Sequence, residues 1–138
     1  MGAYEHYDTS DIDFNEGQWI DYGDFQIKVL YAGSENKKYE KTLEQLTRKY
    51  RRLLGNDDVQ LSDKMKEKME DIYAECFAKS VIIDWKDMTD RDGNDLEFTE
   101  ANVKKVLVDL PMLFKDLREV ASSISTFREE VRKEDEKN

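Results

Sequence analysis

The sequence predicts a mainly α protein, a small bundle of about four helices with a short N-terminal strand and a small β-hairpin near 81–98. Two observations lead to this fold class. Apolar residues recur at spacings of three and four over most of the chain, which is the period of an amphipathic helix. The remaining apolar runs are short, rich in β-forming residues and bounded by glycine, as strands are.

The length and composition predict one small domain. The chain has 138 residues, of which 39% are charged and 11% are aromatic, and a chain of this length can bury its own core. We divide it into an acidic flexible arm at 1–17, a mainly helical domain at 18–132 and a charged frayed tail at 133–138. Up to residue 16 the arm has five acidic residues and neither Lys nor Arg, which is typical of a mobile segment.

A strand is expected within residues 19–32, because apolar and aromatic side chains occupy every second position from Phe25 to Tyr31. This period of two places alternate side chains on one face of a sheet. Gly33 ends the run. Ser34 then offers a side-chain oxygen that can cap the helix that follows.

Two amphipathic helices are predicted next, at 35–54 and at about 63–80. Gly55 is a natural stop for the first helix, and Ser62 can cap the second. Each helix has one apolar stripe. The predicted helices together carry more apolar stripe than a small bundle must bury, so part of it is expected to bind a helical partner. The stripe residues are Tyr39, Leu43, Leu46, Tyr50, Leu53 and Leu54 in the first helix, and Met65, Met69, Ile72, Tyr73, Cys76 and Phe77 in the second.

The segment at 81–98 changes to β-forming residues around an Asp92-Gly93 pair, which predicts a hairpin turn. Its many carboxylates also suggest a calcium loop. An EF-hand loop with Gly93 at its sixth position would place Met88 first and Thr99 last, where calcium requires carboxylates. We therefore expect an acidic turn and no metal.

Two further helices are predicted, at about 100–109 and 111–132. Thr99 can cap the first of them. Pro111 is the only proline and is tolerated in the first turn of a helix, so it should begin the second. One apolar stripe continues through both helices and is expected to be mostly core, as is Met112. The stripe residues are Val103, Val106, Leu107, Leu110, Leu113, Phe114, Leu117, Val120, Ile124, Phe127 and Val131.

The residue inventory argues against an enzyme. His6 is the only histidine and Cys76 the only cysteine, so we expect neither a catalytic histidine pair nor a zinc site. Cys76 lies on an apolar stripe and is predicted to be buried. No glycine-rich phosphate loop is present. We expect no cofactor and no catalytic residue.

The charge distribution bears on partners and location. The net charge of −10 disfavours nucleic acid and anionic membranes as partners, and no apolar run is long enough to span a bilayer. The N-terminus lacks the basic and apolar stretches of a signal peptide. A cytosolic protein is therefore expected.

One predicted helix face is basic, although the chain as a whole is acidic. The predicted helix at 35–54 carries seven basic residues on this face, against Glu40 and Glu44. We favour a solvated face, or one paired with the acidic arm or a neighbouring subunit, over a nucleic-acid-binding regulator. The basic residues are Lys37, Lys38, Lys41, Arg48, Lys49, Arg51 and Arg52.

A run of motifs extends over 82–122: an aliphatic run, an Asp-Trp pair, an acidic turn with glycine, an aromatic residue, a capping Thr, and then a Leu-Pro and a Leu-Phe pair. The stretch at 25–46 adds a strand followed by an Asn and an aromatic residue. The motif residues at 82–122 are Ile82–Ile83, Asp84, Trp85, Asp92, Gly93, Phe98, Thr99, Leu110, Pro111, Leu113 and Phe114. In these two stretches, about half of the chain, the sequence resembles the tail assembly chaperones of long-tailed, lambda-like bacteriophages.

The resemblance implies a non-catalytic protein of the host cytoplasm, absent from the mature virion. Such chaperones bind the tape-measure protein, keep it soluble and promote assembly of the tail tube. The tail-tube protein is therefore a further expected partner. We also expect the chain to associate with other copies of itself. The competing interpretation is a structural neck or tail-completion protein of the virion, which would form rings.

The resemblance and the apolar stripes together assign two sets of residues. The expected partner-binding residues are Tyr39, Leu43, Leu46, Tyr50, Met65, Met69, Leu113, Phe114 and Leu117. The expected structural residues are Trp85, Gly93, Phe98, Thr99 and Pro111.

Overall fold

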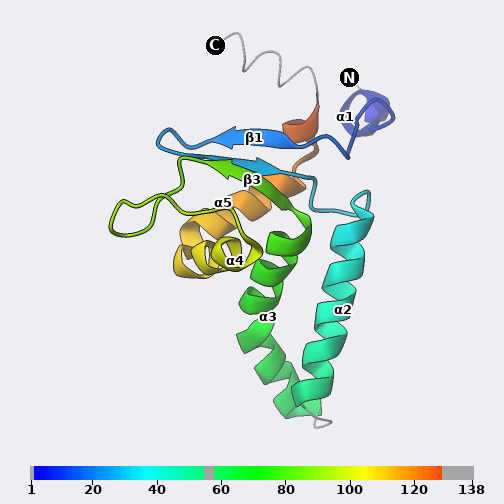
Figure 1. Cartoon of the computed structure of the whole chain (residues 1–138). Helices are drawn as coiled ribbons and strands as arrows, with labels where there is room; N and C mark the ends of the chain where they lie inside the picture. Colours follow the sequence, from blue (N-terminus) through cyan, green and yellow to red (C-terminus); the bar gives the residue numbers. More distant parts are fainter. Residues whose placement is uncertain (1, 55–57, 129–138) are drawn as a thin grey trace.

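The computed structural model describes residues 2–54 and 58–128 and confirms a mainly α fold with a small sheet (Figure 1). Three sequence-based predictions lie outside the described residues: Gly55 as a helix stop, the end of the last helix beyond 128, and the tail at 133–138. The elements, in chain order, are α1 (Ala3–Tyr7), β1 (Gln18–Asp21), β2 (Gln26–Val29), α2 (Lys37–Leu54), α3 (Asp58–Ser80), β3 (Ile82–Lys86), α4 (Glu100–Asp109), α5 (Pro111–Ser122) and the 3₁₀ helix η1 (Ile124–Phe127).

The three strands form one antiparallel sheet in the order β1–β2–β3. Ile20 of β1 lies opposite Ile27 of β2, which in turn lies opposite Trp85 of β3. The sheet therefore joins the N-terminal hairpin to a strand that follows it by more than fifty residues. Everything between β2 and β3, namely α2 and α3, is inserted between two neighbouring strands (Figure 1).

The prediction of a single strand over 19–32 is wrong in its extent, because a turn at residues 22–25 divides it into β1 and β2. Gly23 takes a φ of +90°, a conformation that glycine adopts without steric cost. Its backbone N–H donates a hydrogen bond of 2.8 Å to the Asp21 carboxylate. The Asp-x-Gly spacing is thus the local signal for the turn.

The predicted hairpin at 81–98 is reduced to a short turn. Thr89 and Asp95 form an isolated bridge, and Gly93 takes a φ of +85° between them. The residues after this bridge form no strand, since β3 pairs with β2 instead. The β-forming run at 82–86 is satisfied by a distant strand, and the acidic loop after it connects β3 to α4.

The core lies between the sheet and the helices α3, α4 and α5, which sit on one of its faces (Figure 1). Ile27 and Val29 of β2 are buried against it. At its centre the rings of Phe77 in α3 and Phe114 in α5 meet edge to face, with centroids 5.3 Å apart. Tyr22 of the hairpin turn donates a hydrogen bond of 2.5 Å to the Asp116 carboxylate of α5.

The two helices α2 and α3 pack on each other and extend away from the sheet (Figure 1). Leu46, Ile72 and Cys76 are buried between them in a second, smaller core. Half-buried side chains of both helices surround this cluster; they are Tyr39, Leu43, Tyr50 and Met69.

Asn36, and not the predicted Ser34, caps α2. Its side-chain oxygen accepts a hydrogen bond from the backbone N–H of Tyr39 at 3.0 Å. Its amide group donates to the carbonyl oxygens of Tyr31, at 2.9 Å, and of Ser80, at 3.0 Å. Asn36 is buried, and its hydrogen bonds connect the start of α2 to the end of α3.

Two other predicted helix boundaries need correction. The helix expected at 63–80 begins at Asp58, so Ser62 lies within it; no Gly or Pro between them interrupts the helix. The helix expected at 111–132 ends at Ser122. The Ser122 hydroxyl donates to the Arg118 carbonyl oxygen at 2.7 Å, and such local side-chain bonds compete with helix continuation.

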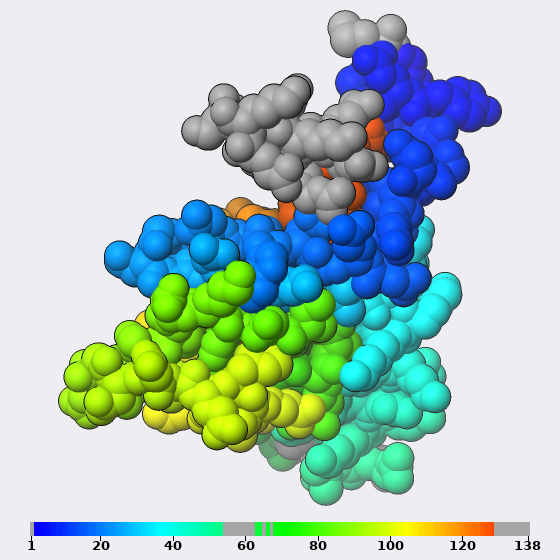
Figure 2. Space-filling view, turned by 45° about the horizontal axis from the view of Figure 1, so that its top comes forward, coloured from blue at the N-terminus to red at the C-terminus, as the bar shows by residue number. Residues whose placement is uncertain are grey.

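The N-terminal arm contains the short helix α1, which lies at one corner of the molecule (Figure 2). The Arg128 guanidinium donates hydrogen bonds to the carbonyl oxygens of Glu5, at 3.0 Å, and His6, at 2.6 Å. Phe14 packs on Tyr31 with ring centroids 4.8 Å apart. These contacts join the arm to the end of β2 and to the C-terminal segment. Its flexibility stays a prediction.

Candidate functional site

Three apolar residues near the junction of α4 and α5 are exposed, and we call them the apolar ridge. It consists of Val108, Leu110 and Met112, whose exposed fractions are 47%, 46% and 76%. Leu110 separates the two helices, and Pro111 begins the second one as predicted. The missing N–H of proline ends α4 here, and the ridge lies where the helix direction changes. Met112, expected in the core, is the most exposed member of the ridge.

A small pocket adjoins the ridge, between α4 and the acidic loop after β3. Its volume is about 100 Å³. Apolar side chains of Leu96, Val106 and Leu110 form part of its wall, so the ridge continues into the pocket. Polar and charged residues complete the lining; they are Thr89, Asp90, Arg91, Asn102, Lys105 and Asp109.

A second pocket, of about 260 Å³, lies on the other side of the same loop, under Trp85. The Trp85 indole N–H donates to the Leu96 carbonyl oxygen at 3.0 Å, and the Phe98 ring packs on the indole edge to face at 5.4 Å. Trp85 is buried, but Phe98 is 37% exposed, so the expectation that both residues belong to the core is wrong for Phe98. Their structural role stays a prediction. Thr99 caps α4 as predicted, since its hydroxyl oxygen accepts a hydrogen bond from the Asn102 backbone N–H at 3.1 Å.

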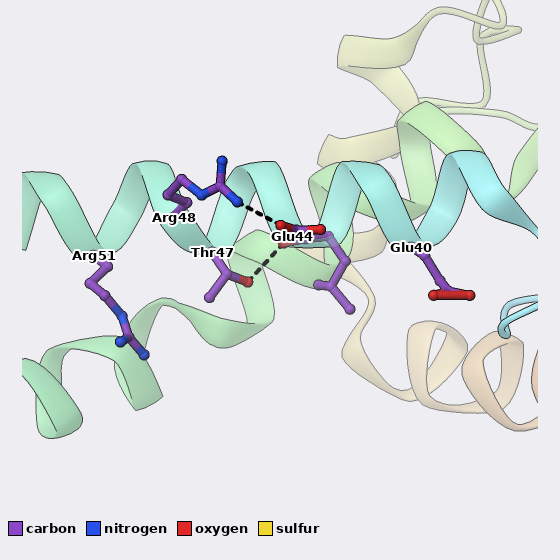
Figure 3. A pocket seen from close by; sticks show the side chains of 6 residues that line it. Glu40, Glu44, Thr47, Arg48 and Arg51 are labelled. Atoms are coloured by element: carbon purple, nitrogen blue, oxygen red, sulfur yellow. Dashed lines mark hydrogen bonds and ion pairs between the residues drawn. The ribbon is translucent and has the colours of Figure 1, made fainter.

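The largest of these hollows is a shallow groove of about 560 Å³ along α2 (Figure 3). Its described lining residues lie on one side of the helix, and we call them the α2 stripe. They are Glu40, Leu43, Glu44, Thr47, Arg48 and Arg51. The stripe has carboxylates in its first half and guanidinium groups in its second half. Leu43 lies between the two carboxylates, and Thr47 lies between Glu44 and Arg48.

The basic face of α2 is exposed: all seven of the predicted basic residues lie at the surface. Two ion pairs balance part of this charge. Arg48 pairs with Glu44 at 2.5 Å (Figure 3), and Lys37 pairs with Glu40 at 4.0 Å. Both pairs lie at the surface, where such contacts contribute little to stability. The face therefore stays available to a partner.

The predicted partner-binding residues divide between the surface and the core. Leu46, Phe114 and Leu117 are buried in the protein's own core, so in this conformation they stabilise the fold and are not available to a partner. The side chain of Met65 lies outside the described residues. The others are half-buried, and Leu43 among them lines the groove; they are Tyr39, Leu43, Tyr50, Met69 and Leu113.

Cys76 is buried in the α2–α3 core, as predicted. Its sulfur lies 3.6 Å from the Tyr39 carbonyl oxygen and 3.7 Å from the Ser80 hydroxyl. Burial raises the pKa of the thiol, and the Glu75 carboxylate raises it further, while the Ser80 hydroxyl acts in the opposite direction. The surroundings thus favour the neutral thiol over the reactive thiolate.

This raised pKa makes stability depend on pH. The folded protein keeps the proton at a pH where the unfolded chain has lost it, so the Cys76 contribution is full below the unfolded pKa and is lost as pH rises through the folded pKa. We expect the free energy of unfolding to fall more between pH 7 and pH 10 in the wild type than in Cys76→Ala. Urea titrations in reducing buffer measure both. Equal pH dependence in the two proteins would contradict the assignment.

The described residues contain neither a candidate metal site nor a candidate membrane span. Within residues 2–54 and 58–128, no group of three His, Cys, Asp or Glu side chains is arranged to hold a metal ion. No helix in the same ranges has the length and hydropathy needed to cross a membrane.

Comparison with known proteins gives one match. No curated protein and no solved structure matches the chain. A family model described as YdaY prophage protein matches residues 34–138. The matched region runs from just before α2 through α5 and so includes both the ridge and the α2 stripe. The chain belongs to the YdaY prophage protein family, and is therefore phage-associated.

Proposed function

We propose that this protein is a tail assembly chaperone, a non-catalytic protein of the host cytoplasm that binds the tape-measure protein and keeps it soluble while the tail tube assembles. The apolar ridge carries this proposal. In a chain with a net charge of −10, three apolar side chains exposed at one helix junction are the observation that supports an interaction site there. The ridge also lies within 82–122, the segment that resembles the chaperones.

The form of the ridge suits a helical partner. Tape-measure proteins are long helical rods, and an amphipathic helix binds by placing apolar side chains on an apolar surface. The pocket beside Leu110 can accept one such side chain, and Arg91 and Lys105 at its edge can pair with acidic residues of the partner. The strongly acidic remainder of the surface would keep the complex soluble.

Co-expression with the tape-measure protein of the same prophage tests the proposal. We expect the wild type to bring the tape measure into the soluble fraction and to co-purify with it. The double variant Val108→Ser with Met112→Ser should reduce the soluble tape measure several-fold, because it makes the ridge polar without touching the core. The control is Leu53→Ser, which replaces an apolar residue at the far end of α2 whose exposure (71%) is close to that of Met112 (76%).

The possible results separate the parts of the proposal. A tape measure that stays insoluble with the wild type contradicts the chaperone function. A tape measure that is solubilised equally well by the double variant contradicts the ridge as its binding site. Detection of this protein in purified phage particles would contradict its absence from the virion and favour the neck or tail-completion interpretation.

A further inference from the structure

We propose that the α2 stripe is a self-complementary surface on which a second copy of this chain docks, with the two α2 helices side by side and antiparallel. A two-fold interface brings the same patch of both copies together, so the patch must complement itself. The α2 stripe meets this requirement through the order of its charges.

The charges change sign at the middle of the stripe. Glu40 and Glu44 stand in its first half, and Arg48 and Arg51 in its second half (Figure 3). With a two-fold axis between residues 45 and 46, Glu40 lies opposite the partner's Arg51. In the same register Glu44 lies within one residue of the position opposite the partner's Arg48. Each carboxylate therefore meets a guanidinium group about 2–8 Å along the helix from the axis, given a rise of about 1.5 Å per residue.

The alternative orientation and other partners fit less well. Parallel helices in register would place carboxylate on carboxylate and guanidinium on guanidinium, which is repulsive. A nucleic acid would meet the two carboxylates in the first half of the stripe, which repel phosphate. The antiparallel second copy is the arrangement in which every charged group of the stripe meets its opposite.

The centre of the stripe supplies apolar contact. Leu43 is half-buried against the small core of Leu46, Ile72 and Cys76, yet its side chain also lines the groove. Thr47 donates its hydroxyl hydrogen to the Leu43 carbonyl oxygen at 2.8 Å, which leaves its methyl group for packing. Both residues lie close to the axis, so the two copies would bury these four side chains between the flanking ion pairs.

The ion pairs already present do not block this contact. Arg48 and Glu44 have exposed side chains, at 63% and 69%, and an exposed helical pair of this kind contributes little to stability. On docking, each group can keep its neighbour and gain the partner's group of opposite sign. The ridge at the α4–α5 junction lies on other elements, so self-association and tape-measure binding can be tested separately.

Charge reversal on the full-length protein tests the proposal. The acid-to-base variant is Glu40→Lys with Glu44→Lys, and the base-to-acid variant is Arg48→Glu with Arg51→Glu. Each makes the stripe uniform in sign, so each alone should associate at least about tenfold more weakly than the wild type, the change expected when close charge pairs become repulsive. Sedimentation velocity over a concentration series measures this, and circular dichroism verifies folding.

Mixing the two variants is the decisive experiment. Their stripes are opposite in sign, so the mixture should form a heterodimer at concentrations at which each variant alone is mostly monomeric. The matched control is Lys38→Glu with Lys49→Glu, which makes the same charge change on the basic face outside the stripe and should associate as the wild type does. A monomeric wild type at every concentration, or a mixture that stays monomeric, would overturn the proposal.

Discussion

Replacing Phe114 with alanine is expected to lower the free energy of unfolding by about 3–5 kcal/mol, the usual cost of removing a buried phenylalanine ring. The side chain is 1% exposed and packs edge to face on Phe77, so its removal leaves a cavity where the sheet and helices meet. Urea titration followed by circular dichroism measures the loss.

Met112→Ala is the matched control, because Met112 lies two residues away on the same helix and is exposed. Its effect should stay within about 0.5 kcal/mol. The comparison also tests the position of the helix: if α5 were rotated so that Phe114 faced a partner, the two substitutions would exchange their effects. A loss below about 1 kcal/mol for Phe114→Ala would contradict the described core.

The second large effect is expected at Asn36. Asn36→Ala removes the cap of α2 and leaves the carbonyl oxygens of Tyr31 and Ser80 without their side-chain donor. A lost cap costs about 1 kcal/mol, and each buried polar group left unsatisfied costs about 1–3 kcal/mol. We therefore expect a loss of about 2–4 kcal/mol, since part of the exposed backbone can regain water.

Asn36→Asp separates the two roles of this side chain. Aspartate keeps the acceptor that caps α2 but loses the amide that donates to the two carbonyl oxygens, and it places a carboxylate beside them. It should therefore be destabilised although the cap is intact. An Asn36→Asp protein as stable as the wild type would show that the cap alone matters. Unfolding titrations of both variants, with Ser34→Ala as the control, decide this.

Local signals predict the parts of the fold that local chemistry determines. The bounds of α4 follow from Thr99 and Pro111, because a capping hydroxyl and a missing N–H act within one helical turn. The turn that divides the predicted strand also has a local signal, at Asp21 and Gly23. The prediction of one continuous strand followed the period-two pattern and not this signal. The pairing of β2 with β3 has none, since the register between distant strands depends on the whole core.

The candidate site is harder to predict for a related reason. An apolar stripe shows that a helix is amphipathic, but it does not show which of its residues the protein buries against itself. Phe114 and Met112 are two positions apart, and one is in the core while the other is on the ridge. The break at Pro111 turns the second helix, and this change of direction decides which side chains remain exposed.

The insertion of α2 and α3 between β2 and β3 has a consequence for synthesis on the ribosome. The chain emerges from its N-terminus, so the β1–β2 hairpin is complete long before Trp85 arrives to pair with Ile27. A two-stranded hairpin is at best marginally stable alone, whereas α2 and α3 can already pack on each other. The nascent protein should thus form the α2–α3 pair first, and its three-stranded sheet only when translation has passed Lys86.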